Sequence, residues 1–234
     1  MLITLKNFIL DLLFPYSCIV CGKQGNYICE DCLNMIEVLE YQFCPICAKR
    51  VIDGKTCANC KTKTKLNGAF SAVSYDSPVI KKMIKQFKYT PFIKDISLIF
   101  SYLIIKHFLI LSNVNALKQG ILIPVPLHRK KLKNRGYNQS QEIAKHLSRF
   151  LNIPLYQNVL IKTKNTHQQV GLLSEQRQKN IKGAFACQNI EQIKNKKIFL
   201  IDDVFTTGAT TSECSKILKQ SGANEVWAVT VARE

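Results

Sequence analysis

Four Cys-x-x-Cys pairs near the start of the chain constrain its fold more than any other feature of the sequence. Two cysteines separated by two residues can place both sulfurs on one metal ion, and two such pairs close a tetrahedral thiolate site. Eight of the ten cysteines form these pairs, which are Cys18/Cys21, Cys29/Cys32, Cys44/Cys47 and Cys57/Cys60. A module this small has little hydrophobic core, so bound metal must supply most of its folding free energy. The sequence therefore predicts a metal-stabilised N-terminal module.

We expect the pairs to close sequentially, two pairs on each ion, because short intervening segments keep the entropic cost of closure low. An interleaved arrangement stays open, and the gap between Cys21 and Cys29 is tight enough to leave one site degenerate. Zinc suits four regular thiolate pairs better than an iron–sulfur cluster does, and disulfides do not suit a reducing compartment. Four thiolates leave no open coordination position, so the predicted role of one or two zinc ions is structural.

The chain shows no sign of a secretory signal or a membrane span. The segment Met1 to Phe14 is apolar, but charged residues interrupt it and no small-residue cleavage site follows. We expect a short helix beside the zinc module there. The most apolar run, Ile96 to Leu111, contains two basic residues and is short for a span of about 20 residues. It predicts a buried helix in a cytoplasmic protein.

The net charge of +17 indicates a polyanionic partner, since surplus Lys and Arg attract phosphates through long-range electrostatics. A composition rich in Lys, Ile and Asn accounts for many of the lysines without any function. It does not account for only 16 acidic residues against 33 basic ones. We therefore expect a basic surface that binds nucleic acid.

The pattern changes after about residue 66, and we predict two domains: a zinc module over residues 1–66 and an α/β domain over 67–234. Buried parallel strands are expected in the apolar run that opens Gly120 to His128, and in Lys197 to Asp203 and Glu225 to Ala232. A basic, turn-prone loop, Arg129 to Asn138, follows the first strand, and a helix then begins. Strand, loop, helix and strand in this order form right-handed crossovers. The prediction is a mostly parallel sheet flanked by helices.

Two helices can be placed from their apolar spacing and their ends. Ile143, Ala144, Leu147 and Phe150 recur on one helical face. A second helix, from about Thr211 to Gln220, is stopped by the Ser-Gly pair that follows it.

The segment between the second strand and its helix carries the most specific chemistry. Thr206, Thr207, Gly208, Ala209 and Thr210 offer hydroxyls and backbone amides just ahead of a helix N-terminus. Gly208 permits the close backbone approach that a phosphate cradle needs.

Two adjacent acids, Asp202 and Asp203, precede this loop. They would repel phosphate, so we expect them to accept hydrogen bonds from the vicinal hydroxyls of a sugar. Ligands of parallel sheets bind at the carboxyl ends of strands, where these residues lie. The predicted ligand combines a phosphate with a ribose.

These residues resemble a known family. The segment IFLIDDVFTTGAT, residues 198–210, resembles the signature that binds 5-phosphoribosyl 1-pyrophosphate (PRPP) in type I phosphoribosyltransferases. The whole chain is similar to the ComF family of bacterial competence proteins, which have a zinc ribbon, a PVPLH…RGYNQ segment and this loop. The stretch NTHQQVGLLSEQRQKNIKGAF, residues 165–185, belongs to the same resemblance.

The resemblance implies a type I phosphoribosyltransferase fold and specific roles for its residues. Asp202 and Asp203 would hold the ribose 2′- and 3′-hydroxyls, one of them through Mg²⁺, and are the best catalytic candidates. The loop from Thr206 to Thr210 would bind the 5′-phosphate. The segment Arg129 to Asn138 would be the pyrophosphate loop, with Arg135 and Gly136 at its centre.

The resemblance also places a mobile hood segment between Thr166 and Asn180. Gln169, Arg177 and Asn180 are its best ligand candidates, although Arg177 also suits a solvated helix face. Thr206 departs from the purine-transferring members, which have an aspartate at this place. This departure puts transfer to a free purine in doubt.

Two functions follow as alternatives. We favour a ComF-like protein that handles single-stranded DNA during natural transformation, with competence proteins as partners. Its phosphoribosyl site would serve as a ligand pocket, and exposed aromatics such as Tyr137 would stack on bases. The alternative is an active phosphoribosyltransferase, a pentosyl-transferring enzyme of nucleotide salvage.

Overall fold

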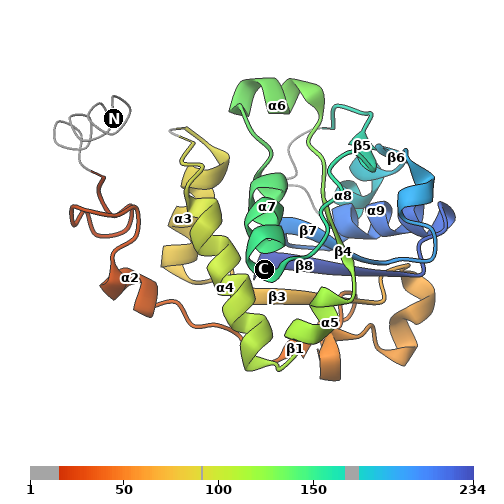
Figure 1. Cartoon of the computed structure of the whole chain (residues 1–234), viewed down its shortest axis with the longest axis horizontal. Helices are drawn as coiled ribbons and strands as arrows, with labels where there is room; N and C mark the ends of the chain where they lie inside the picture. Colours follow the sequence, from red (N-terminus) through yellow and green to blue (C-terminus); the bar gives the residue numbers. More distant parts are fainter. Residues whose placement is uncertain (1–15, 91, 167–173) are drawn as a thin grey trace.

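The computed structural model describes residues 16–90, 92–166 and 174–234. Its centre is a four-stranded sheet in the order β3-β8-β7-β4, in which all three strand pairs are parallel. The strands are β3 (Gly68–Ser74), β4 (Ile121–Pro124), β7 (Lys197–Phe205) and β8 (Glu225–Arg233). Helices cover both faces of the sheet (Figure 1). The predicted fold class, a mostly parallel sheet with flanking helices and a small N-terminal module, is confirmed.

The central strands β7 and β8 are apolar on both faces. Four consecutive residues of β7, Ile198 to Ile201, are buried, as expected for a strand covered on both sides. Because the strands are parallel, their carboxyl ends meet at one edge of the sheet. There Phe205 at the end of β7 pairs with Arg233 at the end of β8.

The helices divide between the two faces. The helices α3 (Pro78–Lys88), α4 (Ile96–Ile110) and α7 (Gln139–Leu151) cover one face, and α9 (Ala209–Gln220) covers the other (Figure 1). Their apolar side chains form two separate cores, one on each side of the sheet. A short helix, α5 (Val114–Lys118), leads into β4.

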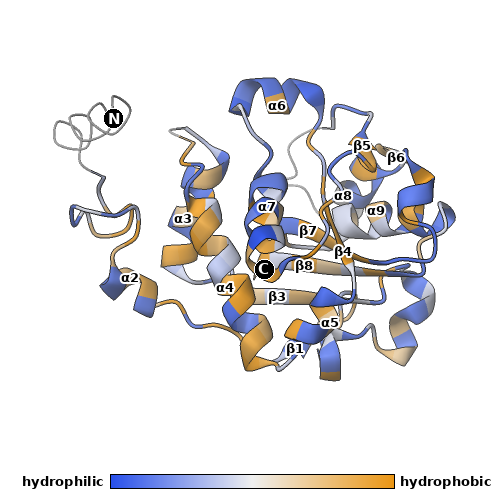
Figure 2. Cartoon of the chain, in the orientation of Figure 1, coloured by the Kyte–Doolittle hydropathy of each residue, from blue (hydrophilic) through white to orange (hydrophobic). Residues whose placement is uncertain are grey.

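The predicted buried helix is confirmed as α4. It is apolar along most of its length (Figure 2), and its Phe100, Ile104 and Phe108 are buried in the core. Within the three described stretches of chain, every helix falls short of the length and hydropathy that crossing a membrane requires.

The predicted loop from Arg129 to Asn138 was wrong in part, because its first seven residues form the helix α6 (Arg129–Arg135). Lys, Leu and Arg are good helix formers, and the His128 side chain accepts a hydrogen bond from the Lys130 amide at 3.3 Å. Gly136, at a φ of 82°, ends the helix.

The predicted strand at the start of Gly120 to His128 is confirmed as β4, which ends at Pro124. One expectation about α7 needs correction. Phe150, predicted on the buried face of α7, is 60% exposed. It lies in the last turn and stacks on His146 of the same helix, with the ring centroids 6.3 Å apart.

A small two-stranded sheet lies beside the main one. Its strands β5 (Leu160–Lys162) and β6 (Phe185–Cys187) are antiparallel. The helix α8 (Ser174–Ile181) lies between them in the chain, and a 3₁₀ turn, η3 (Ile190–Gln192), follows.

The N-terminal module consists of short elements. These are α2 (Glu30–Asn34), β1 (Gln42–Phe43), β2 (Arg50–Val51) and the 3₁₀ turns η1 (Ile52–Gly54) and η2 (Ala58–Lys63). Its Ile28 and Ile36 belong to the same hydrophobic core as Phe70 and Met83 of the α/β part. The predicted domain boundary after residue 66 stays a prediction.

A buried histidine joins the module to α4. His107 is 1% exposed, and its Nδ1–H donates to the Leu39 carbonyl at 2.6 Å. The Gln42 side-chain amide donates to His107 Nε2, while the Gln42 Oε1 accepts from the Ser71 amide at 3.0 Å. His107 is therefore held as the neutral Nδ1–H tautomer. Burial lowers its pKa from the usual 6.5 to about 4, although the Leu39 carbonyl opposes the shift.

This pKa predicts a pH-dependent contribution to stability. Because the folded-state pKa is lower than the unfolded one, the contribution is complete above pH 6.5 and is lost as the pH falls toward 4. At 1.36 kcal/mol per pKa unit, the loss is roughly 3 kcal/mol. We expect the difference in unfolding free energy between the wild type and His107→Gln to shrink by this amount from pH 7.5 to 4. Denaturant titrations at fixed zinc would measure it, and a pH-independent difference would contradict it.

Candidate functional site

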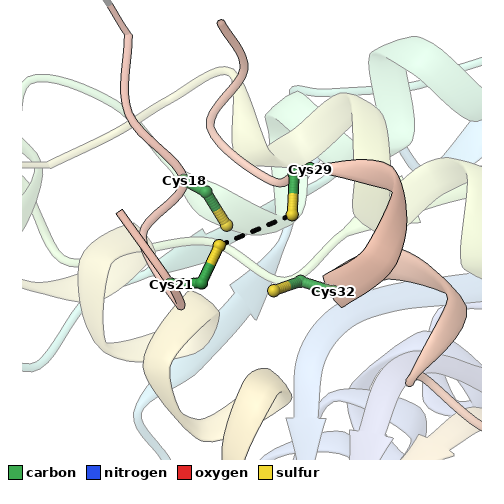
Figure 3. A group of neighbouring side chains, drawn as sticks. All are labelled: Cys18, Cys21, Cys29 and Cys32. Carbon is green, nitrogen blue, oxygen red and sulfur yellow. Dashed lines mark hydrogen bonds between the residues drawn. The ribbon is translucent and has the colours of Figure 1, made fainter. Parts of the chain in front are cut away.

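The eight paired cysteines gather into two groups of four. Cys18, Cys21, Cys29 and Cys32 form one, and Cys44, Cys47, Cys57 and Cys60 form the other. Within each group all sulfurs lie within 4.8 Å of one another. Figure 3 shows the first group, whose four side chains point toward a common centre. The sequential pairing is confirmed, and both groups are complete despite the tight gap after Cys21.

The two groups are built in the same way. In each first pair, the leading cysteine's carbonyl accepts from an amide four residues on: Gly22 to Cys18 at 2.8 Å and Ala48 to Cys44 at 3.2 Å. Both donors have a positive φ. In each second pair, the leading cysteine immediately precedes a helical turn, α2 or η2. The module is therefore an internal repeat of one metal-binding unit.

The sulfur spacing fits zinc. Tetrahedral coordination at 2.3 Å per bond requires sulfurs about 3.8 Å apart. The Cys21 and Cys29 sulfurs are separated by 3.6 Å, and those of Cys47 and Cys57 by 3.7 Å. All four positions of each site are thiolates, so zinc held there is structural.

The two predicted acids lie at the carboxyl end of β7. Asp203 Oδ1 forms an ion pair with Lys88 Nζ of α3 at 2.8 Å. Asp202 Oδ1 accepts two hydrogen bonds, from the Ser140 hydroxyl of α7 and from the Asp203 amide, both at 2.9 Å. Three elements far apart in sequence thus meet at these two carboxylates.

The charges of Asp202, Asp203 and Lys88 influence one another. Burial, and then the neighbouring charge of Asp203, raise the pKa of Asp202 to about 7. The charge of Lys88 and the hydrogen bonds from the Asp203 amide and Ser140 oppose this shift. Burial lowers the pKa of Lys88, but the charge and hydrogen bond of Asp203 outweigh it, so the pKa is raised overall. The acids therefore carry less negative charge near neutral pH than two exposed aspartates would.

The predicted phosphate loop, Thr206 to Thr210, follows β7 directly, and its last two residues form the start of α9. Gly208 caps this helix at a φ of 70°, and a Cβ placed there would lie 2.6 Å from the Phe205 ring. Both the backbone conformation and the space require glycine. The Thr207 hydroxyl accepts from the Ala209 amide at 3.4 Å. The loop therefore presents backbone amides at the positive end of a twelve-residue helix.

Further basic side chains interact electrostatically with the acids. Arg135 of α6 is half-buried, and the charge of Asp203 opposes the lowering of its pKa by burial. Burial, and then repulsion by Lys131, lower the pKa of Lys162 to about 8. The charge of Arg135 thus interacts with Asp203 and that of Lys162 with Asp202, while Lys131 interacts with both of these cations.

The structure brings most of the predicted ligand residues to one edge of the sheet. Gly136 lies at the end of α6, next to Arg135. Asn180 lies in α8, whereas Gln169 and the side chain of Arg177 fall outside the described residues.

Tyr137 does not have the exposure predicted for it. It is only 9% exposed, and its hydroxyl donates to the Phe87 carbonyl at 2.8 Å. Its ring packs against Phe87 with the centroids 5.6 Å apart, so it cannot stack on a base. Of the two cysteines outside the pairs, Cys214 is buried and Cys187 is partly buried.

Sequence reasoning missed Lys88, Ser140 and Lys162 as members of the site. Lys88 ends an amphipathic helix and Ser140 begins another, so both resemble ordinary surface or capping residues. Only the fold brings them to Asp202 and Asp203. The run of basic residues in α6 was the available signal for Lys131.

Comparison with known proteins gives two kinds of sequence match. A family model described as a double zinc ribbon domain matches residues 9–61. Competence protein F of Haemophilus influenzae is 29% identical over 94% of this chain and 98% of its own length. Competence protein ComFC of Bacillus subtilis is 26% identical, with 86% and 81% covered. DNA utilization protein YhgH of Escherichia coli K12 is 24% identical, with 86% and 95% covered.

Solved structures show weaker likeness. A purine phosphoribosyltransferase from Pyrococcus horikoshii aligns with a TM-score of 0.32 and 16% identity, over 60% of this chain and 82% of that one. An allosteric regulatory enzyme of purine biosynthesis aligns with a TM-score of 0.34 and 13% identity. This chain covers 58% of its own length in that alignment and only 24% of the enzyme. Scores this low support no inference, and the fold class rests on the sheet itself.

We predict two zinc ions per chain, one in each group of four cysteines. Cys21→Ser and Cys47→Ser should each lose one ion, because the two sites share no ligand. Elemental analysis of the purified protein measures both values, with Cys187→Ser as the control. Substantial iron, or a disulfide between paired cysteines, would contradict the assignment.

Proposed function

Because this chain belongs to the ComF family of competence proteins, we propose that it binds a phosphoribosyl ligand and single-stranded DNA during DNA uptake. The two relatives named as competence proteins, and the match over most of the chain, support the role in DNA uptake. The observation that carries the ligand proposal is the pair of acids placed directly before a loop of amides at a helix N-terminus.

In this proposal each part of the edge takes one part of PRPP. The amides and hydroxyls from Thr206 to Thr210 hold the 5′-phosphate. Asp202 and Asp203 accept hydrogen bonds from the ribose hydroxyls. The cations of α6, chiefly Arg135 and Lys131, face the pyrophosphate, with Gly136 giving the chain its turn beside them.

Mg²⁺ would accompany PRPP, since carboxylate oxygens and phosphates are the ligands it prefers. The Asp203 carboxylate would be a metal ligand, and its negative charge is now balanced by the Lys88 ammonium. Asp202 is held in place by Ser140, so it stays oriented toward the edge of the sheet. Bound Mg²⁺ would supply neutralisation of the pyrophosphate charge.

The Asp202→Asn/Asp203→Asn double variant should bind PRPP at least about a hundredfold more weakly, because it loses charge-assisted hydrogen bonds to two hydroxyls. Isothermal titration calorimetry with Mg²⁺ measures the affinity. Asp53→Asn/Asp76→Asn removes the same charge from exposed positions and is the matched control. If the two double variants bind PRPP with equal affinity, the site assignment is wrong.

The proposed DNA surface includes the outer face of α6. Arg129, Lys130 and Lys133 are exposed there, while Lys131 and Arg135 are partly buried. In Figure 1 this helix stands clear of the sheet. A cationic face of this kind binds phosphates without sequence preference, and the net charge of +17 adds long-range attraction.

Binding of single-stranded DNA should weaken steeply with salt, because each neutralised phosphate releases counterions. Replacing Arg129, Lys130 and Lys133 with Gln should flatten the log–log salt slope by about 2, at 0.7 per contact. Fluorescence anisotropy with a labelled oligonucleotide measures this slope.

The control replaces Lys118, Lys194 and Lys196 with Gln, which removes the same charge. All three are exposed and shortly precede strands, at the opposite edge of the sheet. Equal slopes for both triple variants would leave only non-localised attraction and would contradict the α6 assignment.

The alternative function is an active phosphoribosyltransferase. The cations around the site favour it, since they would stabilise the charge of departing pyrophosphate. Thr206 argues against transfer to a purine, since the purine-transferring members have an aspartate at this place. Pyrophosphate release from PRPP, measured across a panel of bases with and without single-stranded DNA, separates turnover from binding.

A further inference from the structure

Arg233 contacts both the second zinc unit, which contains Cys44, Cys47, Cys57 and Cys60, and β7, the strand that leads into the phosphate loop. Arg233 Nη2 donates to the Cys44 carbonyl at 3.3 Å. This is the carbonyl that also accepts from Ala48 and so closes the turn of the zinc knuckle. The Arg233 guanidinium carbon lies 5.3 Å from the Phe43 ring centroid and 5.1 Å from that of Phe205, within the range of cation–π attraction.

Phe205 in turn shapes the loop. It is 1% exposed and pairs with Arg233 across the sheet. Its ring occupies the space beside Gly208 that a side chain would need. A shift of this ring would therefore remove the wall against which the loop turns.

The second zinc unit also reaches the far end of the loop. Thr64 follows η2, the turn that contains Cys60, and is 9% exposed. Its hydroxyl lies 3.4 Å from that of Ser212 in the first turn of α9. The Ser212 amide donates to the Gly208 carbonyl at 2.8 Å. Strand end and helix start are thus both held by the same zinc unit.

We propose that the second zinc site, formed by Cys44, Cys47, Cys57 and Cys60, sets the shape of the 206–210 loop and hence its affinity for a phosphoribosyl ligand. Arg233 and Thr64 are the positioning residues. The inference rests on the proposed ligand, and its physical basis is a set of direct contacts at both ends of the loop. The inference assigns this role to the second zinc site alone, although the first site has the same local structure.

The first zinc unit offers a matched comparison. It contacts the α/β part through Lys82 of α3, whose ammonium donates to the Val20 carbonyl at 3.1 Å. Val20, like Cys44, lies in the first knuckle of its unit. In Figure 1, α2 of this unit lies on the opposite side of the molecule from α9. Lys82→Met and Arg233→Met therefore each remove one positive charge and one hydrogen bond to a backbone carbonyl of a zinc unit.

The test combines PRPP affinity, measured by calorimetry, with amide hydrogen exchange of a peptide covering residues 205–212. Arg233→Met should weaken PRPP binding at least about fivefold, the lower range of site–site coupling. It should also speed exchange in this peptide. Lys82→Met should change neither quantity. Arg233→Lys keeps the cation between the two rings, so it should restore part of the affinity.

Other outcomes would overturn the inference. Equal effects of Lys82→Met and Arg233→Met would mean a general loss of stability, and no effect of Arg233→Met would mean that the contacts do not hold the loop. Thr64→Val keeps every zinc ligand and should also speed exchange in this peptide. If Arg233→Met fails to fold, unchanged exchange in Thr64→Val would overturn the inference. A wild type that does not bind PRPP would refute the proposed function, while the exchange measurements would still test the hold on the loop.

Discussion

The pairing of β7 with β8 is the interaction on which the site depends. Eight residue pairs from Lys197↔Glu225 to Phe205↔Arg233 fix the register of two strands buried on both faces. If β7 slipped by one residue, Asp202 and Asp203 would each point to the other face of the sheet, and Phe205 would no longer pair with Arg233. The acids, the loop after them and the contact to the second zinc unit therefore share one structural cause.

The zinc module depends on the sheet in a different way. Its own elements are too short to form a core, and metal coordination supplies local folding free energy. Its orientation comes from the larger part of the chain, through Val38 paired with Val73 and Lys55 with Gly68. His107 adds a buried connection between the two zinc units at Leu39 and Gln42. Metal binding shapes each unit, and the edge strand β3 holds the second one against the sheet.

Features encoded by local spacing could be predicted from the sequence. The cysteine pairs, the buried strand before Asp202 and the glycine at the helix start all follow from short-range geometry. The sequential pairing followed because closing neighbouring segments costs little entropy. The segment from Thr206 to Thr210 could be placed at the start of a helix because its signal lies in five consecutive residues, and its binding of phosphate stays a prediction.

Features that depend on packing could not be predicted. Lys88 is separated from Asp203 by more than a hundred positions, and no pattern in α3 marks it as an ion-pair partner. Tyr137 lies in a basic segment that suggests exposure, yet its hydroxyl finds the Phe87 carbonyl and its ring joins the core. The helical state of α6 was missed because glycine and asparagine near its end outweighed the helix formers before them.

The Lys88–Asp203 ion pair has a consequence for what can enter the site. A tethered ammonium 2.8 Å from the carboxylate is present at a high effective concentration and never diffuses away. A free divalent cation must displace it and leave a half-buried ammonium without its counterion, which is costly. A cation that is bound to phosphate brings an anion with it. When this cation displaces Lys88 from Asp203, the phosphate can become the new partner of Lys88. In the function proposed above, this ion pair would therefore favour the entry of a metal–phosphate complex over that of a bare metal ion.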